Sequence, residues 1–161
     1  MYEDILREEG CDPGVIAHCR AVADRAQEYA VSPSVDRDLL RTGAFLHDIG
    51  RSETHSLRHA EVGADSARSL GYAEGVVRII QRHIGAGLTS EECALLGLLP
   101  RDGMPQRIEE RIVAHADNLV KGTRRITLEE RMDRSTDLGR KARVRAFRLA
   151  LDLEPLLHIR K

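Results

Sequence analysis

The sequence predicts an all-α fold, a compact single-domain bundle of six to eight helices over residues 1–161. Apolar residues recur at helical spacing along most of the chain. Capping residues, prolines and glycines divide the chain into segments of helical length. No segment shows the convincing alternation of apolar and polar residues that marks a half-buried strand. The connections between the predicted helices are short, which favours neighbouring helices packing against each other.

The first four helices are delimited mainly by prolines and glycines. Asp12 and Pro13 form an N-cap and a first-turn proline, and an apolar stripe follows as far as Tyr29. The segment 32–34, Ser-Pro-Ser, breaks this helix. The next three helices cover about residues 35–46, 57–70 and 73–84, and their stop signals are Gly50, Gly71 and Gly85.

The remaining helices begin at capping patterns or at a proline. They cover about residues 89–99, 105–120 and 127–153. A capping box, in which a Thr precedes a Glu by three residues, opens the first and the third of them. The two boxes are Thr89 with Glu92 and Thr127 with Glu130. Pro105 opens the middle helix, and Pro100 and Gly122 act as stop signals.

The composition argues against several classes of protein. Lys and Arg number 25 and Asp and Glu number 26, so the net charge is −1. This balance argues against a protein whose main role is to coat nucleic acid or an anionic membrane. Aromatic residues make up only 3% of the chain, which disfavours a base-stacking surface. Nucleic acid is therefore not an expected partner.

Cysteines and the N-terminal segment indicate a cytoplasmic protein. The three cysteines, Cys11, Cys19 and Cys93, are odd in number and include no Cys-x-x-Cys pair, so we expect reduced, buried thiols. Residues 1–9 are charged and carry no apolar run, so no signal peptide is expected. No segment approaches the length of a transmembrane helix, so no membrane partner is expected.

Histidines and aspartates in apolar helices predict a metal site. His47 and Asp48 end the second helix, where the backbone can turn so that both side chains reach one ion. His18 lies beside the apolar stripe of the first helix, and Asp117 interrupts the apolar segment 112–120. A carboxylate there is costly to bury unless it is paired or bound to a metal. Two imidazoles and two carboxylates suit a first-row divalent metal.

These residues carry a resemblance to a known family. His18, the segment Gly43-Ala44-Phe45-Leu46-His47-Asp48-Ile49-Gly50 and Asp117 resemble the H…HD…D pattern of the HD-domain superfamily of metal-dependent phosphohydrolases, including its HDIG motif. The resemblance covers about residues 13–122, the core of the expected single domain, and leaves about 123–161 as a C-terminal helical extension. It implies an all-α bundle with the metal at its centre.

Two further histidines extend the resemblance. His59 opens the segment 59–64, His-Ala-Glu-Val-Gly-Ala, and His83 lies in Arg-His-Ile-Gly, residues 82–85. The series is similar to the HD proteins that hold two metals, and most of all to the small stand-alone hydrolases that cleave diadenosine tetraphosphate symmetrically. By that resemblance one metal is held by His18, His47, Asp48 and Asp117, and Asp48, His59 and His83 hold or face a second. The chain has Arg51 where that family usually has Lys.

The resemblance implies hydrolysis of a small-molecule phosphate substrate, a nucleotide or a related phosphoester or phosphoanhydride. One or two divalent metals (Fe, Mn, Co, Ni or Zn) would activate the attacking hydroxide. Asp48 and Arg51 are the expected catalytic residues, because the planar guanidinium of Arg51 can neutralise a phosphate. The further candidates for substrate binding are Thr54, Arg58 and Lys121.

Two alternatives and the oligomeric state stay open. A catalytically silent HD module could bind a nucleotide for regulation, although a complete ligand set argues against this. An RNA-associated protein could use the basic run 140–148, although the balanced charge disfavours it and a solvated helix face explains the run more simply. A homo-oligomer is compatible with the sequence.

Three of the seven histidines are not expected to bind metal. They are His55, His115 and His158. The four-residue spacing of His55 and His59 does not make a zinc-protease motif, since Ser56 stands where that motif requires Glu.

Overall fold

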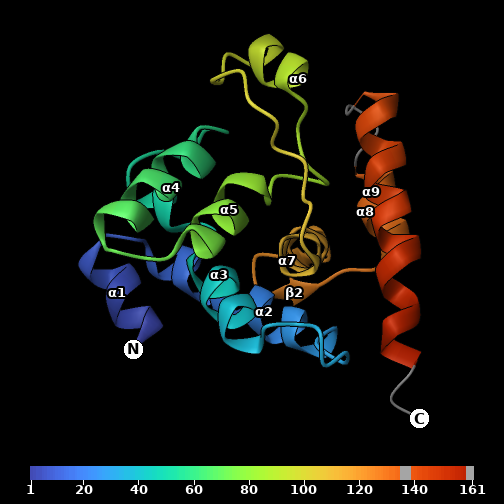
Figure 1. Ribbon diagram of the computed structural model, residues 1–161, viewed down its shortest axis with the longest axis horizontal. Helices are drawn as coiled ribbons and strands as arrows, with labels where there is room; N and C mark the ends of the chain where they lie inside the picture. The colour runs from blue at the N-terminus through green and yellow to red at the C-terminus, as the bar shows by residue number, and fades with distance from the viewer. Residues whose placement is uncertain (135–138, 159–161) are drawn as a thin grey trace.

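The computed structural model describes residues 1–134 and 139–158, and it confirms the all-α class (Figure 1). Within these residues the helices are α1 (Tyr2–Glu8), α2 (Pro13–Glu28), α3 (Arg37–Leu46), α4 (His59–Ser69), α5 (Glu74–Arg82), α6 (Ser90–Leu95), α7 (Ile108–Asn118), α8 (Leu128–Asp133) and α9 (Arg140–Leu153). The short elements are the 3-10 helices η1 (Ile49–Ser52) and η2 (Glu154–His158) and the strands β1 (Val120–Lys121) and β2 (Arg124–Arg125).

The nine α-helices of the described residues exceed the six to eight predicted. Helix α1 was not predicted, because Leu6 is its only buried residue and its apolar periodicity is therefore weak. The predicted helix 127–153 is present as two helices, α8 and α9. Residues 135–138 of that predicted helix lie outside the described part of the chain.

A two-stranded hairpin between α7 and α8 was also not predicted. Val120 pairs with Arg125 and Lys121 with Arg124 in antiparallel register. Gly122 has a φ of 59°, a left-handed conformation that glycine adopts without strain. Strands of two residues are too short to show an alternating pattern, so the sequence signal here is only that of a helix end.

The two Thr–Glu capping boxes identified the starts of α6 and α8 correctly, whereas α7 begins at Ile108 and not at the predicted Pro105. Thr89 and Thr127 each accept a hydrogen bond from the backbone N–H three residues on, and both capping boxes are complete. Asp12 is the N-cap residue of α2 with a proline at the first position, but its side chain makes no capping hydrogen bond.

Two apolar clusters form the core, and they meet beside the end of α3. One lies among α2, α3, α7 and α9 and includes Ile112 and Leu149. The other lies among α1, α2, α4 and α5 and includes Leu6 and Val77. Phe45 belongs to the first cluster and Leu46 to the second, so the residues that follow Leu46 enter the middle of the bundle. Cys11, Cys19 and Cys93 are free thiols and buried, as predicted.

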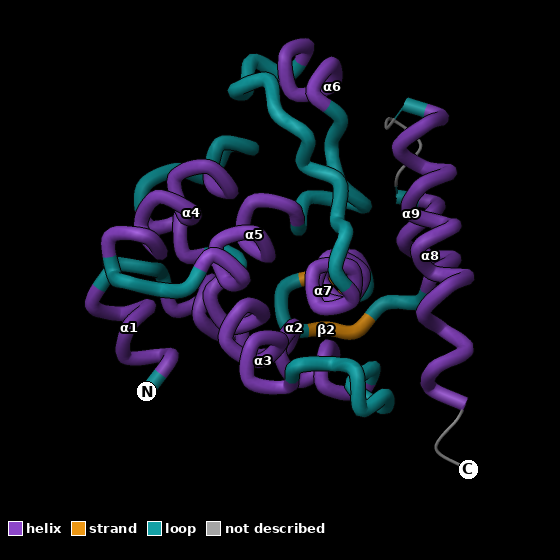
Figure 2. The backbone as a smooth tube through the Cα atoms, in the orientation of Figure 1, coloured by secondary structure: helices purple, strands orange, loops and turns teal. Residues whose placement is uncertain are grey.

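Two elements stand apart from the central bundle. Figure 2 shows α6 on two extended loops above the body of the molecule and α9 along one side. No helix in residues 1–134 or 139–158 is long and apolar enough to cross a membrane.

Candidate metal centre

The HDIG segment forms a tight turn that backs onto α4. Helix α3 ends at Leu46, His47 is its C-cap, and Asp48 precedes η1. A Cβ on Gly50 would lie 2.1 Å from the carbonyl oxygen of His59 and 2.5 Å from the amide nitrogen of Gly63. Only glycine allows this close approach of the two backbones, which brings the start of α4, with His59, next to Asp48.

Asp48 lies between four histidines from four different helical elements. Its Oδ1 is 3.2 Å from Nε2 of His59 and 3.5 Å from Nε2 of His83, the C-cap of α5. Its Oδ2 is 3.7 Å from Nε2 of His47 and 3.8 Å from Nε2 of His18, which lies in α2. Each oxygen of one carboxylate therefore faces its own pair of imidazoles.

Asp117 completes the cluster from the last turn of α7. Its Oδ1 lies 3.0 Å from Nε2 of His18 and 3.6 Å from Nε2 of His47. Two sets of three residues each bring ligand atoms within 4.8 Å of one another, and they are His18, His47 and Asp117, and His47, Asp48 and His83. The structure thus brings together all six residues that the sequence analysis proposed as ligands.

The hydrogen bonds of the Nδ1 atoms determine which ring nitrogen of each of the four histidines carries the proton. Each Nδ1 lies 2.7–2.8 Å from a backbone carbonyl oxygen. The pairs are His18 with Gly122, His47 with Ala44, His59 with Ser56, and His83 with Ile80. A carbonyl oxygen only accepts hydrogen bonds, so Nδ1 carries the proton and Nε2 of the neutral ring presents a lone pair to the centre.

The centre therefore has an excess of acceptors. Nε2 of His59 lies 3.1 Å from Nε2 of His83, so two lone pairs face each other when both rings are neutral. Nε2 of His47 and Oδ1 of Asp48 are buried and have no hydrogen-bond partner among the described residues. Buried acceptors without a donor are costly, and a cation at their centre removes that cost. This donor set fits one or two divalent transition metals.

The close approach of histidines and aspartates also shifts the pKa values of His47, Asp48 and Asp117. Burial would lower the pKa of His47, but the negative charge of Asp48 outweighs it and raises that pKa well above its ordinary value. Burial would raise the pKa of Asp48, but the positive charge of His47 and the nearby imidazoles of His59 and His83 lower it well below its usual range. The pKa of Asp117 is lowered against its burial by the histidines around it. Both carboxylates stay ionised, so the centre attracts cations.

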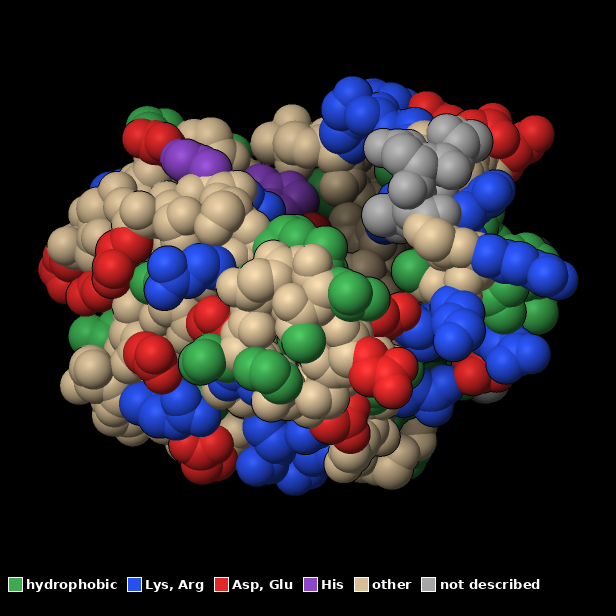
Figure 3. All heavy atoms as spheres, turned by 90° about the horizontal axis from the view of Figure 1, so that it is seen from above, with side chains coloured by type: hydrophobic (Ala, Val, Ile, Leu, Met, Phe, Trp, Pro, Cys, Tyr) green, Lys and Arg blue, Asp and Glu red, His purple; other side chains and the backbone are tan. Residues whose placement is uncertain are grey.

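A pocket of about 360 Å³ opens onto this centre. His18, His59, His83 and Asp117 form part of its lining. Figure 3 shows histidine side chains beside a hollow on the face that carries α6. The pocket has a basic lining, formed by Arg51, Lys121, Arg131 and Arg134, and an apolar one that includes Leu57, Ile84 and Val120.

The four predicted substrate residues occupy different environments. Arg51 lines the pocket, and its Nε donates to Oδ2 of Asp48 at 2.6 Å, a pairing that the sequence analysis did not foresee. Lys121 is exposed and lines the pocket. Thr54 hydrogen bonds to Ser56, and Arg58 is 68% exposed and lies 4.0 Å from Glu61. Among the described residues, the pocket lining includes neither Thr54 nor Arg58.

Sequence reasoning missed three polar residues of the pocket, Asn118, Arg131 and Arg134. Asn118 is buried, donates from Nδ2 to the carbonyl of Gly85 at 2.8 Å, and accepts from Nε of Arg131 at 3.0 Å. It thereby joins α7, the loop after α5, and α8 around the pocket. The position of Asn118 directly after Asp117 was the one available signal, whereas the approach of α8 depends on the unpredicted hairpin.

The three histidines expected not to bind metal lie outside the cluster. His55 is 67% exposed, and His158 is also exposed. His115 is buried, and its Nε2 donates to Oε1 of Glu154 at 2.8 Å. His115 therefore lies in the packed interior, away from the cluster.

The fold and this cluster define the class of protein: an all-α domain with a histidine–aspartate centre built around an HD pair. The chain belongs to the HD domain family, whose profile matches residues 15–122.

Two curated relatives show how this domain occurs in other proteins. An uncharacterized protein of Methanocaldococcus jannaschii is 48% identical over 125 residues, which cover 74% of this chain and 74% of that protein. The tRNA (cytidine(56)-2'-O)-methyltransferase of Picrophilus torridus is 45% identical over 130 residues, which cover 81% of this chain. The match covers only 38% of the methyltransferase, so this chain corresponds to part of that enzyme.

A solved structure shares the fold. The HD domain of the L. monocytogenes phosphodiesterase PgpH, solved in complex with cyclic-di-AMP, has a TM-score of 0.59 and 17% sequence identity. The match covers 92% of this chain and 90% of that domain. At this identity the likeness concerns the fold alone.

Proposed function

We propose that this protein is a metal-dependent phosphohydrolase that acts on a nucleotide or a related phosphoester or phosphoanhydride. One observation carries the proposal: four imidazoles direct their Nε2 atoms at two buried or half-buried carboxylates. The hydrogen bond of each Nδ1 to a backbone carbonyl holds the rings in this orientation.

The donor set divides into two metal positions that share Asp48. His18, His47, Asp117 and Oδ2 of Asp48 would hold the first metal. Oδ1 of Asp48, His59 and His83 would hold the second. Two divalent metals, when bound, supply a hydroxide nucleophile at neutral pH and neutralise phosphate oxygens.

The residues of the chain would orient the substrate. Arg51 commits its Nε–H to Asp48, so its Nη groups remain to bind a phosphate oxygen. Lys121 and Arg134 line the same pocket and would neutralise further phosphate charge. Leu57 and Ile84 form an apolar surface suited to a nucleobase or another apolar group of the substrate.

The relatives support a substrate with nucleotide chemistry. The PgpH domain binds cyclic-di-AMP, and a Ribonuclease Y of Cutibacterium acnes is 38% identical to this chain over 72 residues. The likeness to diadenosine tetraphosphate hydrolases suggests a dinucleoside polyphosphate as one member of the same class. These substrates share a nucleoside joined through phosphate, which fits a pocket with both basic and apolar lining.

A substrate panel tests the proposal. Metal-free protein is supplied with Mn, Co, Ni, Fe or Zn and assayed on diadenosine tetraphosphate, cyclic-di-AMP, nucleoside phosphates and a short RNA. We expect metal-dependent cleavage of at least one of them. Bound metal together with nucleotide binding but no cleavage would favour the silent regulatory module. Absence of both metal binding and cleavage would refute the proposed function altogether.

A further inference from the structure

Exposed apolar side chains gather in two places outside the lining of the pocket at the metal centre. Nine large apolar side chains are exposed within the described residues. Six of these nine fall in two clusters, Leu95, Leu96 and Leu99 at one place and Val144, Phe147 and Leu151 at the other. Clusters of exposed apolar groups, unlike single ones, mark interaction surfaces.

The first cluster, here called the α6 tip, comprises Leu95, Leu96 and Leu99. Their side chains are 87%, 49% and 64% exposed, on an element that stands away from the body of the molecule (Figure 2). Glu91 and Asp102 are exposed acidic residues of the same segment, which consists of α6 and the loops on either side of it. Within the described residues no ion pair involves either of them. The α6 tip is therefore apolar and acidic.

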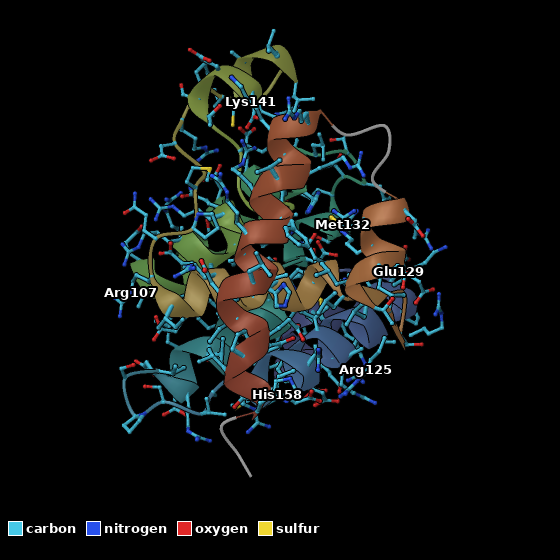
Figure 4. The ribbon with its side chains drawn as sticks, turned by 90° about the vertical axis from the view of Figure 1, so that its right-hand side faces the viewer. Arg107, Arg125, Glu129, Met132, Lys141 and His158 are labelled. Atoms are coloured by element: carbon cyan, nitrogen blue, oxygen red, sulfur yellow. The ribbon has the colours of Figure 1, made fainter. Side chains whose placement is uncertain are left out.

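The second cluster, here called the α9 groove, has the opposite charge. Val144, Phe147 and Leu151 lie at spacings of three and four residues, on one face of α9. With Met132 of α8 they line a groove of about 420 Å³, and Figure 4 shows Met132 beside α9. The charged residues of the groove lining are all arginines, namely Arg140, Arg143 and Arg148.

The arginines of the α9 groove have no acidic partner among the residues that the structure describes. In residues 1–134 and 139–158 no carboxylate lies within ion-pair distance of Arg140, Arg143 or Arg148. Nε of Arg143 is buried and has no hydrogen-bond partner. By contrast, the neighbouring Arg145 is paired with Glu92 at 2.6 Å. The groove therefore fits an occupant that is both apolar and acidic, which is the character of the α6 tip.

The α6 tip cannot fill the groove of its own chain. Arg145 fixes α6 to the other flank of α9 through Glu92 and, at 3.1 Å, through the carbonyl of Gly87. In Figure 4 α6 lies to the upper left of α9, whereas Met132 lies to its right. Cys93 and Leu98 of the same segment are buried, and they line a pocket together with Leu57 and Ala60 of the body.

We propose that two copies of this chain form a closed dimer in which the α6 tip of each copy occupies the α9 groove of the other. Such an arrangement is isologous, so it buries both apolar clusters and pairs the acidic tip with the basic groove twice. The occupant is a second copy of this chain because the chain itself carries the complementary surface.

The association is tested by sedimentation velocity over a concentration series. The wild-type chain should form a dimer, and Leu95→Asp and Phe147→Asp should each raise the dissociation constant at least about tenfold. Leu70→Asp is the matched control, since Leu70 is 44% exposed and belongs to neither cluster. Circular dichroism melting curves verify that each variant is folded.

Charge reversal tests the pairing itself. Glu91→Arg and Arg148→Glu should each weaken the dimer, and the two changes together in one chain should restore it. A wild-type chain that stays monomeric at every concentration would overturn the proposal. A dimer that Phe147→Asp dissociates and Leu95→Asp leaves intact would overturn it too, because α9 would then pair with α9.

Discussion

Asp48 is the residue on which the proposed site depends most. Each of its oxygens faces a different pair of histidines, and the residue is buried. Asp48→Asn keeps the size of the side chain but removes its charge and half of its acceptor capacity. We expect metal affinity and hydrolysis to fall more than about 100-fold, since even partners of metal ligands contribute roughly 10- to 100-fold.

The matched control for Asp48→Asn is His55→Asn, a change at an exposed histidine outside the cluster. Metal content and the rate of hydrolysis should stay at the wild-type level in this variant. If Asp48→Asn retained both properties, the cluster would not be the reactive centre.

His59 distinguishes a centre with two metals from a centre with one. It contacts Oδ1 of Asp48 and Nε2 of His83 but neither His18 nor Asp117, so it belongs to the second position only. We expect His59→Ala to bind about one metal per chain fewer than the wild type and to lose most of its activity. Elemental analysis beside a rate assay checks this. An unchanged metal content and rate would rule out the second metal.

The sequence could predict which residues form the cluster but not everything around them. These residues can be recognised in the sequence because His47 and Asp48 end an apolar helix and Asp117 interrupts another. The pairing of Arg51 with Asp48 depends on the path of η1, and the place of Arg131 depends on a hairpin of two-residue strands. Neither feature leaves a periodic signal in the sequence.

Packing between helical elements holds the side chains of the cluster in place, and the contact at Gly50 is the clearest example. Its Cβ would collide with backbone atoms of α4, so Gly50→Ala must push η1 and α4 apart. We expect a loss of about 3 kcal/mol or more in the free energy of unfolding, together with weaker metal binding. Urea denaturation measures the first effect.

Gly14→Ala is the matched control for Gly50→Ala. Gly14 lies in α2 with nothing within 4 Å of its Cβ position, so alanine should stabilise the protein by about 0.5–1 kcal/mol. Equal stabilities of the two alanine variants would contradict the close packing of η1 on α4.

A buried ion pair joins α5 to α7 and makes stability depend on pH. Glu110 is 1% exposed and accepts from Nη1 of Arg82 at 2.9 Å and from the backbone of Gln106 at 2.8 Å. Burial would raise the pKa of Glu110, but these hydrogen bonds and the charge of Arg82 lower it below the ordinary 4.5. The unfolded chain therefore takes up the proton first as the pH falls.

The stabilising contribution of Glu110 is thus complete above pH 4.5 and is lost as the pH falls through the folded pKa. Glu110→Gln should lower the free energy of unfolding at pH 7 by about 3 kcal/mol, and this difference should shrink in acid. Glu129→Gln, at an exposed position of α8, should change neither quantity. If the loss of unfolding free energy in Glu110→Gln stayed constant with pH, the lowered pKa of Glu110 would not be its cause.

Helix starts were predictable at the two Thr–Glu capping boxes, but not at the caps formed by Asp36 and Arg107. Both Thr–Glu capping boxes are present as predicted, since they depend on residues three apart. Helix α1 was missed because its stability comes from packing against α2 and α3, a tertiary contact that its own sequence does not show.

At the scale of the whole molecule, the all-α class followed from the helical spacing of apolar residues, and the bundle confirms it. The meeting of two core clusters beside Leu46 explains why the HD pair lies at the centre of the bundle. The excursion of α6 and the groove of α9 were not predictable, because both depend on which helix faces remain uncovered after folding. Three arginines of the basic run on α9 border an apolar groove, and the proposed dimer would give this face a role beyond solvation.

The central claim is that this histidine–aspartate cluster holds divalent metals, and the metal content of the protein tests it most directly. The wild type and Asp48→Asn are purified without chelator, dialysed against Mn, Co, Ni, Fe or Zn, and analysed for metal per chain. We predict about two metals per wild-type chain and almost none in the variant. A wild-type chain that binds none of these metals would contradict the account.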